Sequence, residues 1–103
     1  MTTKSYNGWT NYETWAVNLW LDNDEGSQSY WAEQATEALE RADNDVDDAV
    51  TALAESIQEQ HEESLPELHG FASDLLNAAM SEVNWREIAR ALVAAAAKEE
   101  ANA

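Results

Sequence analysis

The chain has 103 residues and no cysteine, so it is long enough for one modest hydrophobic core and has neither disulfides nor thiolate metal sites. It carries 21 acidic residues against five basic ones, and this net charge of −16 repels nucleic acids and anionic membranes and favours basic protein surfaces as partners. Because 45% of the residues are hydrophobic and five are tryptophan, the composition predicts a folded domain and not a disordered chain.

The sequence contains no apolar stretch long enough to span a membrane. The N-terminal residues 1–4 lack the apolar region of a signal peptide, and the absence of cysteine agrees with a reducing compartment. We therefore expect a soluble, cytoplasmic protein in which residues 1–103 form a single domain. Residues 1–5 and about 97–103 are expected to be flexible.

Helical periodicity runs along the chain, and three glycines and one proline are too few for a hairpin-rich fold. The residues Thr10-Asn11-Tyr12-Glu13 have the spacing of a capping box and predict a first helix that begins there and ends at Leu21. The following segment, residues 22–26, favours a turn, and Gly26 suits a left-handed helix cap.

This first helix is apolar on most sides. One face holds Tyr12, Trp15, Ala16, Leu19 and Trp20, whereas Val17 and Leu21 lie on the far side. A helix that is apolar all round is usually buried, and we favour that interpretation. The alternative is an exposed patch that binds a partner, or a second copy in a weak homodimer through the first helix.

Two further helices are predicted, from near Ser29 to Ala42 and from Val46 to about Glu62, with Asp45 as the N-cap of the latter. The first of these two places Trp31 on its apolar stripe. The second has apolar residues at the i, i+3, i+4, i+7 spacing of an amphipathic helix, namely Val46, Ala49, Val50, Leu53 and Ile57.

The last third of the chain predicts two more helices. A capping box at residues 64–67 predicts the start of the fourth helix, which should bury Leu68, Phe71, Ala72, Leu75 and Ala79. Asn84 is the expected N-cap of the fifth, where Val83 and Ile88 have the spacing of a hydrophobic staple. The apolar face of this fifth helix includes Trp85, and the alanine-rich tail from Ala94 is expected to fray.

Short connections between amphipathic helices predict an all-α fold, a compact bundle or orthogonal array of four to five short helices. We expect a monomeric fold without a sheet. The residues predicted to be buried in its core are Trp15, Leu19, Trp31, Leu53, Ile57, Leu75, Trp85 and Leu92.

Two segments together carry a resemblance to a known group of proteins. The first is the aromatic run Tyr6-Asn7-Gly8-Trp9-Thr10-Asn11-Tyr12-Glu13-Thr14-Trp15 with Val17, Leu19, Trp20 and Asn23-Asp24 after it, and the second is Asp74–Ala79 leading into Val83–Ala89. In these segments the chain resembles a family of small uncharacterised proteins of bacteriophages, plasmids and bacterial chromosomes, over roughly Tyr6 to Leu92. The resemblance implies a mobile-element setting and implies no activity.

Acidic residues follow the outward faces of the second and third predicted helices. Residues 22–67 hold 15 of the acids and one base, Arg41, and so carry −14 of the net charge. Like charges one turn apart cost roughly 0.2–0.5 kcal/mol per pair, so this arrangement is mildly destabilising.

B-DNA carries one negative charge per about 1.7 Å of axis, and the acidic stripes are able to imitate it. Solubility or adaptation to salt is the alternative, although salt adaptation should acidify all faces.

The residues expected to contact a basic nucleic-acid-binding partner are Glu33, Glu37, Glu40, Asp47, Asp48, Glu55, Glu59 and Glu62. On this interpretation the protein is an acidic inhibitor, encoded by a mobile element, that occupies the nucleic-acid-binding surface of a host defence protein and acts as an anti-CRISPR or antirestriction factor. The alternative is a structural or regulatory adaptor that binds through the aromatic first helix.

Two acidic clusters have part of the pattern of a calcium-binding loop. Asp22, Asp24 and Glu33 match its first, third and last ligand positions, but the required glycine and another oxygen ligand are missing. Helix capping explains this cluster and the one at residues 43–47, and the two histidines do not fit a zinc motif. Since no phosphate-binding loop or nucleophile motif is present, we predict no metal, no cofactor and no enzymatic activity.

Overall fold

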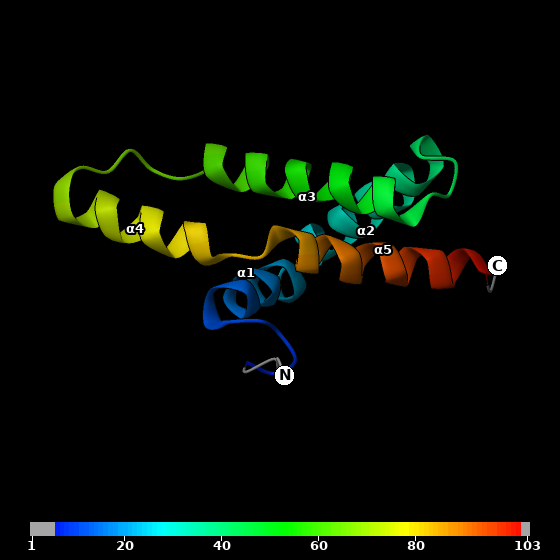
Figure 1. The fold of residues 1–103 in the computed structure, drawn as a ribbon, viewed down its shortest axis with the longest axis horizontal. Coiled ribbons are helices and arrows are strands. Elements are labelled where there is room, and N and C mark those ends of the chain that lie inside the picture. The colour runs from blue at the N-terminus through cyan, green and yellow to red at the C-terminus, as the bar shows by residue number, and fades with distance from the viewer. Residues whose placement is uncertain (1–5, 102–103) are drawn as a thin grey trace.

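The computed structural model describes the backbone of residues 6–101 and the side chains of residues 6–99. Figure 1 shows five helices: α1 (Tyr12–Asn23), α2 (Glu25–Arg41), α3 (Val46–Glu63), α4 (Gly70–Glu82) and α5 (Trp85–Ala101). Over this range the backbone forms no strand, and Tyr6 and Trp9 make an isolated antiparallel bridge. The predicted all-α fold is confirmed. None of these five helices is long and apolar enough to cross a membrane.

The core lies between α2, α3 and α5. The predicted apolar stripe of α3 is confirmed at Val50, Leu53 and Ile57, which are at most 2% exposed, although Val46 at its N-terminus is exposed. Helix α5 packs against both α2 and α3. One alanine on each of the three helices is completely buried, so the helix axes can approach closely at Ala35, Ala49 and Ala89.

Three rings cross the interior next to this core. His61 of α3 lies between Trp31 of α2 and Trp85 of α5, with ring centroids 6.1 and 5.8 Å away. The Nδ1 atom of His61 is 2.7 Å from the carbonyl oxygen of Ile57 in the preceding turn. The predicted burial of Trp31 and Trp85 is confirmed. Because each helix contributes one of the three rings, their contacts hold α2, α3 and α5 together at this point.

The start of α1 is joined to the connection between α4 and α5. The side chain of Asn11 caps α1, because its Oδ1 accepts from the backbone N–H of Thr14 at 2.9 Å, and its Nδ2 donates to the carbonyl of Glu82 at 2.7 Å. The Thr14 hydroxyl donates to Asn11 Oδ1 and accepts from the backbone N–H of Asn84 at 2.8 Å. The predicted N-cap of α5 is confirmed, since Asn84 Oδ1 accepts from the N–H of Glu87.

Several predicted helix boundaries are wrong. The N-cap of α1 is Asn11 and not Thr10, and α1 continues to Asn23. Helix α2 begins at Glu25, four residues before the predicted start, because Asp24 serves as its cap and accepts from the N–H of Gly26 at 3.1 Å. Gly26 therefore lies in the first turn of α2 and is no left-handed cap.

Two left-handed residues follow the other end of α2. Asp43 and Asn44, in the connection to α3, have φ values of 53° and 67°. Asparagine and aspartate tolerate this conformation better than other non-glycine residues. The chain then enters α3 at Asp45, whose side chain caps the helix as predicted.

The rotation of α1 differs from the prediction. Its buried residues are Thr14 and Leu21, and Val17 packs against the core beside them. Leu19, predicted to be buried, is exposed, and Trp15 is only half-buried. The hydrogen bonds of Thr14 explain the difference, because a hydroxyl with its partners satisfied can occupy the core and bring its own face of the helix inward.

Helix α4 differs most from the prediction. It begins at Gly70, because Ser64 ends α3 as its C-cap and residues 66–69 form no helix. It has no buried residue, and Leu75, predicted to be in the core, is 59% exposed. The reason is that α5 occupies the space between α2 and α3, so α4 packs against α1 alone among the helices of residues 6–101.

The C-terminal segment is helical beyond Ala94. Helix α5 continues to Ala101, since Val93 and Ala96 are buried against the core, while Leu92, predicted to be buried, is half-buried. The flexibility expected of residues 1–5 falls outside the described residues.

Candidate protein-binding surfaces

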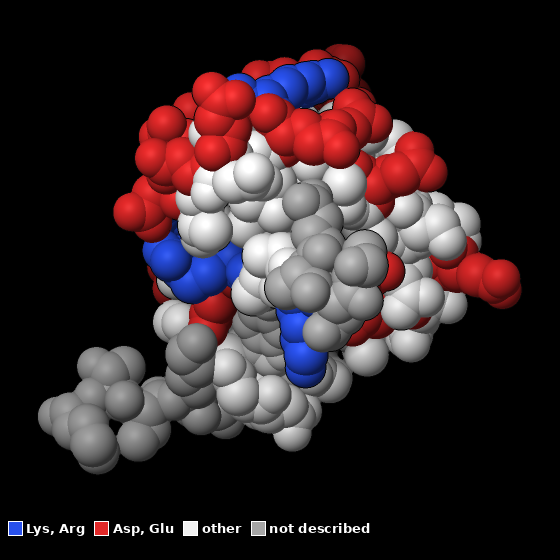
Figure 2. Space-filling model, turned by 90° about the vertical axis from the view of Figure 1, so that its right-hand side faces the viewer, with Lys and Arg blue, Asp and Glu red and all other residues white. Residues whose placement is uncertain are grey.

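The acidic face consists of the eight carboxylates that the sequence singles out on α2 and α3. Seven of them are exposed, and Glu37 is half-buried. Helical periodicity explains why these side chains point outward, since each helix places its apolar stripe on the opposite side. Figure 2 shows acidic side chains gathered over the upper part of the molecule, near the connection between α2 and α3, and mostly uncharged side chains below.

Little positive charge balances the acidic face. Arg41 forms an ion pair with Glu37 at 3.2 Å, and its side chain is 79% exposed, which makes the pair a weak one. The other seven carboxylates form no ion pair with any base among the described residues. Arg86 of α5 donates to the Thr51 hydroxyl of α3 at 2.8 Å and not to a carboxylate. The face therefore presents largely uncompensated negative charge.

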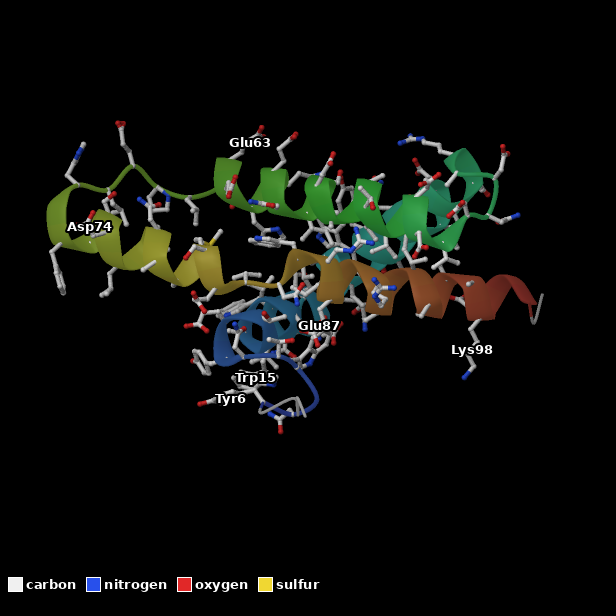
Figure 3. All side chains as sticks on the ribbon, viewed as in Figure 1. Tyr6, Trp15, Glu63, Asp74, Glu87 and Lys98 are labelled. Atoms are coloured by element: carbon white, nitrogen blue, oxygen red, sulfur yellow. The ribbon has the colours of Figure 1, made fainter. Side chains whose placement is uncertain are left out.

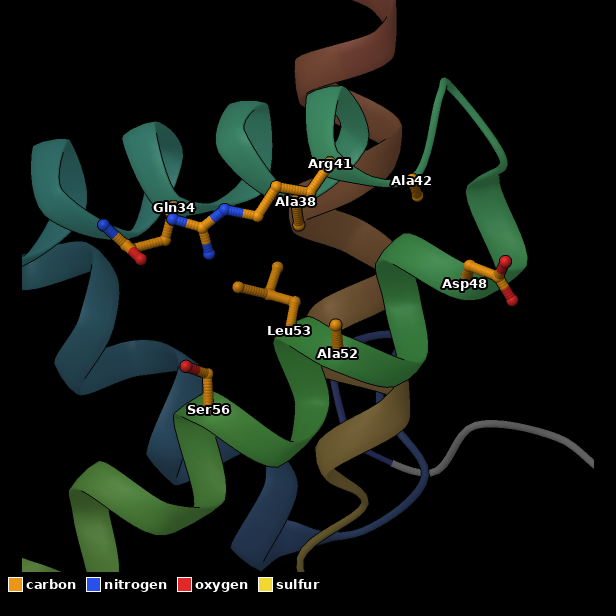
Figure 4. A pocket seen from close by; sticks show the side chains of 8 residues that line it. All are labelled: Gln34, Ala38, Arg41, Ala42, Asp48, Ala52, Leu53 and Ser56. Carbon is orange, nitrogen blue, oxygen red and sulfur yellow. The ribbon is translucent and has the colours of Figure 1, made fainter.

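A hollow of about 280 Å³ opens beside the acidic face between α2 and α3 (Figure 4). Its base is apolar and includes Leu53, whereas Arg41 and Asp48 are at the rim. Its complete lining is Gln34, Ala38, Arg41, Ala42, Asp48, Ala52, Leu53 and Ser56. This volume and lining suit one side chain of a protein partner, since interface hot spots are side chains held in such desolvated pockets.

Two of the carboxylates considered for metal binding cap helices. Asp24 caps α2 and Asp45 caps α3. Among the described residues, no three carboxylate or histidine side chains come together as a metal site. His61 stacks on Trp31 and lies tilted beside Trp85, and His69 precedes α4 and is exposed.

The second candidate surface is apolar and lies on α1 and α4. Trp20 is 76% exposed and Phe71 is 81% exposed, the two largest exposed fractions among the large apolar side chains described. A hollow of about 240 Å³ lies where α1, the end of α3 and α4 meet, and Trp20, Leu65 and Met80 line it. Exposed apolar patches of this kind mark interaction sites.

A third aromatic group surrounds the N-terminal end of α1. Figure 3 shows Tyr6 and Trp15 close to each other below this helix, with ring centroids 6.4 Å apart. Tyr12 packs edge-on against Tyr6 at 5.4 Å. These three rings pack against one another and hold the segment before α1 in place. Tyr6, Tyr12 and Trp15 of the aromatic motif therefore have a structural role.

The chain was compared with protein families, curated proteins and solved structures by its similarity alone, and one family model matches. A family model described as a family of unknown function matches residues 2–98. The chain belongs to DUF7249. This family covers both the aromatic N-terminal motif and the junction around Asn84. No curated protein and no solved structure matches the chain.

Sequence reasoning missed the apolar surface of α4 and the role of Thr14. A periodic apolar stripe predicts which residues share a face of α4, but not whether another helix covers that face. The clue for Thr14 was the motif itself, because Asn11 and Thr14 have the i, i+3 spacing of an N-cap and its bonded residue.

Proposed function

We propose that this chain is an acidic inhibitor, encoded by a mobile element, that occupies the basic nucleic-acid-binding surface of a host defence protein. The observation that carries the proposal is the acidic face, with seven exposed carboxylates that no described base neutralises. Such a surface attracts a basic protein over long range and accelerates association.

The dimensions of α3 support imitation of a duplex. Its acidic stripe runs from Asp48 to Glu62, which spans roughly 21 Å at 1.5 Å per residue. A duplex of that length carries on the order of 12 charges. The acidic face carries eight carboxylates, one of them paired with Arg41, so it presents seven uncompensated charges. Its charge is thus of the same order as that of the duplex.

The test is competition for DNA on purified restriction and CRISPR effector complexes. The chain should release duplex DNA from its target, and inhibition should weaken as salt screens the charges. The variant Glu55→Lys/Glu59→Lys should inhibit at least tenfold less. Its matched control is Asp74→Lys/Glu99→Lys, which changes the net charge equally but lies outside the acidic face, and it should inhibit normally. Simultaneous binding of DNA and the chain to one complex would contradict the proposal.

A second candidate function is an adaptor that binds a partner through the aromatic first helix, with acidity serving solubility. The exposure of Trp20 favours it. Under this alternative Trp20→Ala abolishes partner binding, the lysine variants do not, and binding changes little with salt.

A further inference from the structure

The hollow of about 240 Å³ beside α1 is the cavity that His61 lines. Figure 1 shows its region, where α1 lies beside the connection between α4 and α5. Apolar cavities of about 150 Å³ hold one benzene ring, so this hollow has room for a single ring or a fused pair of rings. Its apolar lining comes from four segments of the chain: Ala16, Val17 and Trp20 of α1, Leu65 after α3, Met80 of α4 and Trp85 of α5.

His61 supplies this hollow with one hydrogen-bond acceptor. Its Nδ1 is 2.7 Å from the carbonyl oxygen of Ile57, and because a carbonyl oxygen only accepts, Nδ1 carries the ring proton. In the neutral ring Nε2 is then an acceptor, and it points away from the α3 backbone to which Nδ1 is bound. Nε2 forms no hydrogen bond with residues 6–99 and is not sealed from solvent. The other polar side chain of the lining, Ser64, donates its hydroxyl proton to the carbonyl of His61 at 2.9 Å.

The lining and the surrounding charge favour an uncharged aromatic ligand. Trp20 and Trp85 offer rings against which another aromatic ring packs, and the sulfur of Met80 makes favourable contacts with ring edges. Anions are repelled, because Glu62 and Glu63 follow His61 directly and the chain carries a net charge of −16. A ligand that satisfies Nε2 of His61 also has to donate one hydrogen bond.

We propose that the hollow binds a small, uncharged aromatic compound of the indole or phenol class, whose single N–H or O–H donates to Nε2 of His61. A free compound touches only the lining. A protein that inserted a side chain here would also have to desolvate the exposed carboxylates of Glu62 and Glu63, which lie between His61 and Ser64 in the chain. The inference does not rest on the proposed function, since no residue of the acidic face lines this hollow.

A bound ring adds packing that α4 lacks. This helix has 13 residues, no side-chain cap and no buried residue, and isolated helices of that length are marginal in water. Met80 lines the hollow together with residues of α1 and α5, so the ligand contacts all three helices. At a tenfold excess over the Kd, openings of α4 that release the ligand become about tenfold rarer. Amide hydrogen exchange in α4 should slow by about the same factor.

The experiment is titration of the full chain with indole, followed through the N–H resonances of the tryptophan side chains. Binding should be saturable with a Kd on the order of 0.1–1 mM, as expected for a ligand of about nine non-hydrogen atoms. Benzofuran has the same shape but no donor, and it should bind at least threefold more weakly. The anion indole-3-acetate should also bind at least threefold more weakly, because of its charge.

Two variants locate the site. Ala16→Leu extends an apolar side chain into the hollow and should weaken indole binding at least tenfold, because the side chain and the ring compete for the same volume. The matched control Ala52→Leu makes the same change in the hollow between α2 and α3 and should bind indole as the wild type does. Circular dichroism checks that both variants retain the fold.

Four outcomes would overturn the proposal. They are the absence of saturable binding at several millimolar indole, equal affinities for indole and benzofuran, an unchanged affinity in Ala16→Leu, and amide exchange in α4 that indole does not slow. Tighter binding of N-acetyl-tryptophanamide than of indole would also contradict it, because the hollow would then be a site for the side chain of a protein partner.

Discussion

The backbone N–H of Asn84 donates a 2.8 Å hydrogen bond to the hydroxyl of Thr14, a completely buried residue 70 positions earlier in the chain. The same hydroxyl donates to Asn11, whose amide reaches the carbonyl of Glu82. Through these bonds the N-terminus of α1 is fixed to the connection between α4 and α5. The motif around Thr14 is thus first of all a structural joint.

Replacement of Thr14 by valine should destabilise the protein by about 1–3 kcal/mol, because it leaves the partly buried N–H of Asn84 without its acceptor while it preserves the shape of the side chain. Urea denaturation gives the change in the free energy of unfolding. The control is Thr36→Val, at a hydroxyl that donates to the carbonyl of Ala32 within α2. That change should stay within about 0.5 kcal/mol, and equal losses would argue against the joint.

Two of the four leucines that the sequence placed in the core, Leu53 and Leu75, should behave differently. Leu53 is 2% exposed, so Leu53→Ala should cost about 2–5 kcal/mol through lost burial and the cavity left behind. Leu75 is 59% exposed, so Leu75→Ala should change stability by less than about 0.5 kcal/mol. Thermal denaturation at low micromolar concentration measures both. A large effect at Leu75 would contradict the exposed position of α4.

Salt should stabilise the fold. Carboxylates one turn apart, such as Glu33 with Glu37 and Glu55 with Glu59, repel each other by roughly 0.2–0.5 kcal/mol per pair. Several such pairs together predict a gain of about 1 kcal/mol in unfolding free energy when salt screens them. The measurement is urea denaturation at low and high sodium chloride, with Glu55→Lys/Glu59→Lys as the variant. The variant should be at least as stable as the wild type and less sensitive to salt.

The C-terminal part of α5 should contribute to stability. Ala96 is 5% exposed, so Ala96→Asp buries a charge and should cost more than about 2 kcal/mol. Ala95 is exposed, and Ala95→Asp makes the same chemical change on the other side of the helix with little effect. Melting temperatures of the two variants compare them directly. Identical melting temperatures would indicate that this segment frays.

Calcium and zinc should leave the melting temperature nearly unchanged, because Asp24 and Asp45 are engaged as helix caps. Binding to the folded state alone would raise stability by about 2.7 kcal/mol at a hundredfold excess over the dissociation constant, an effect easily detected. A saturable rise at micromolar calcium would refute the capping interpretation.

The sequence predicted well what depends on local periodicity. The stripe of Val50, Leu53 and Ile57 and the caps at Asp45 and Asn84 follow from spacing alone, and the structure confirms them. The outward direction of the carboxylates follows from the same periodicity, because a carboxylate opposite an apolar stripe has to face solvent.

It predicted less well what depends on competition between segments. Helix α4 also has an apolar face, but α5 packs against α2 and α3, whereas α4 packs against neither of them. For α1, hydrophobicity favoured a buried Leu19, whereas the buried hydrogen bonds of Thr14 turn a different face inward. Neither outcome is visible in one segment taken alone.

The position of α5 in the chain has a consequence for synthesis. Helices α2 and α3 precede it, and both bury their apolar faces against it, while the partners of Thr14 and Asn11 lie at its N-terminal end. During translation, the joint of α1 is incomplete until Asn84 has emerged, and the core is incomplete until Trp85–Ala96 has emerged. Until then the apolar faces of α2 and α3 remain open to proteases and chaperones, so a nascent chain interrupted before α5 is a substrate for degradation and not a smaller version of the fold.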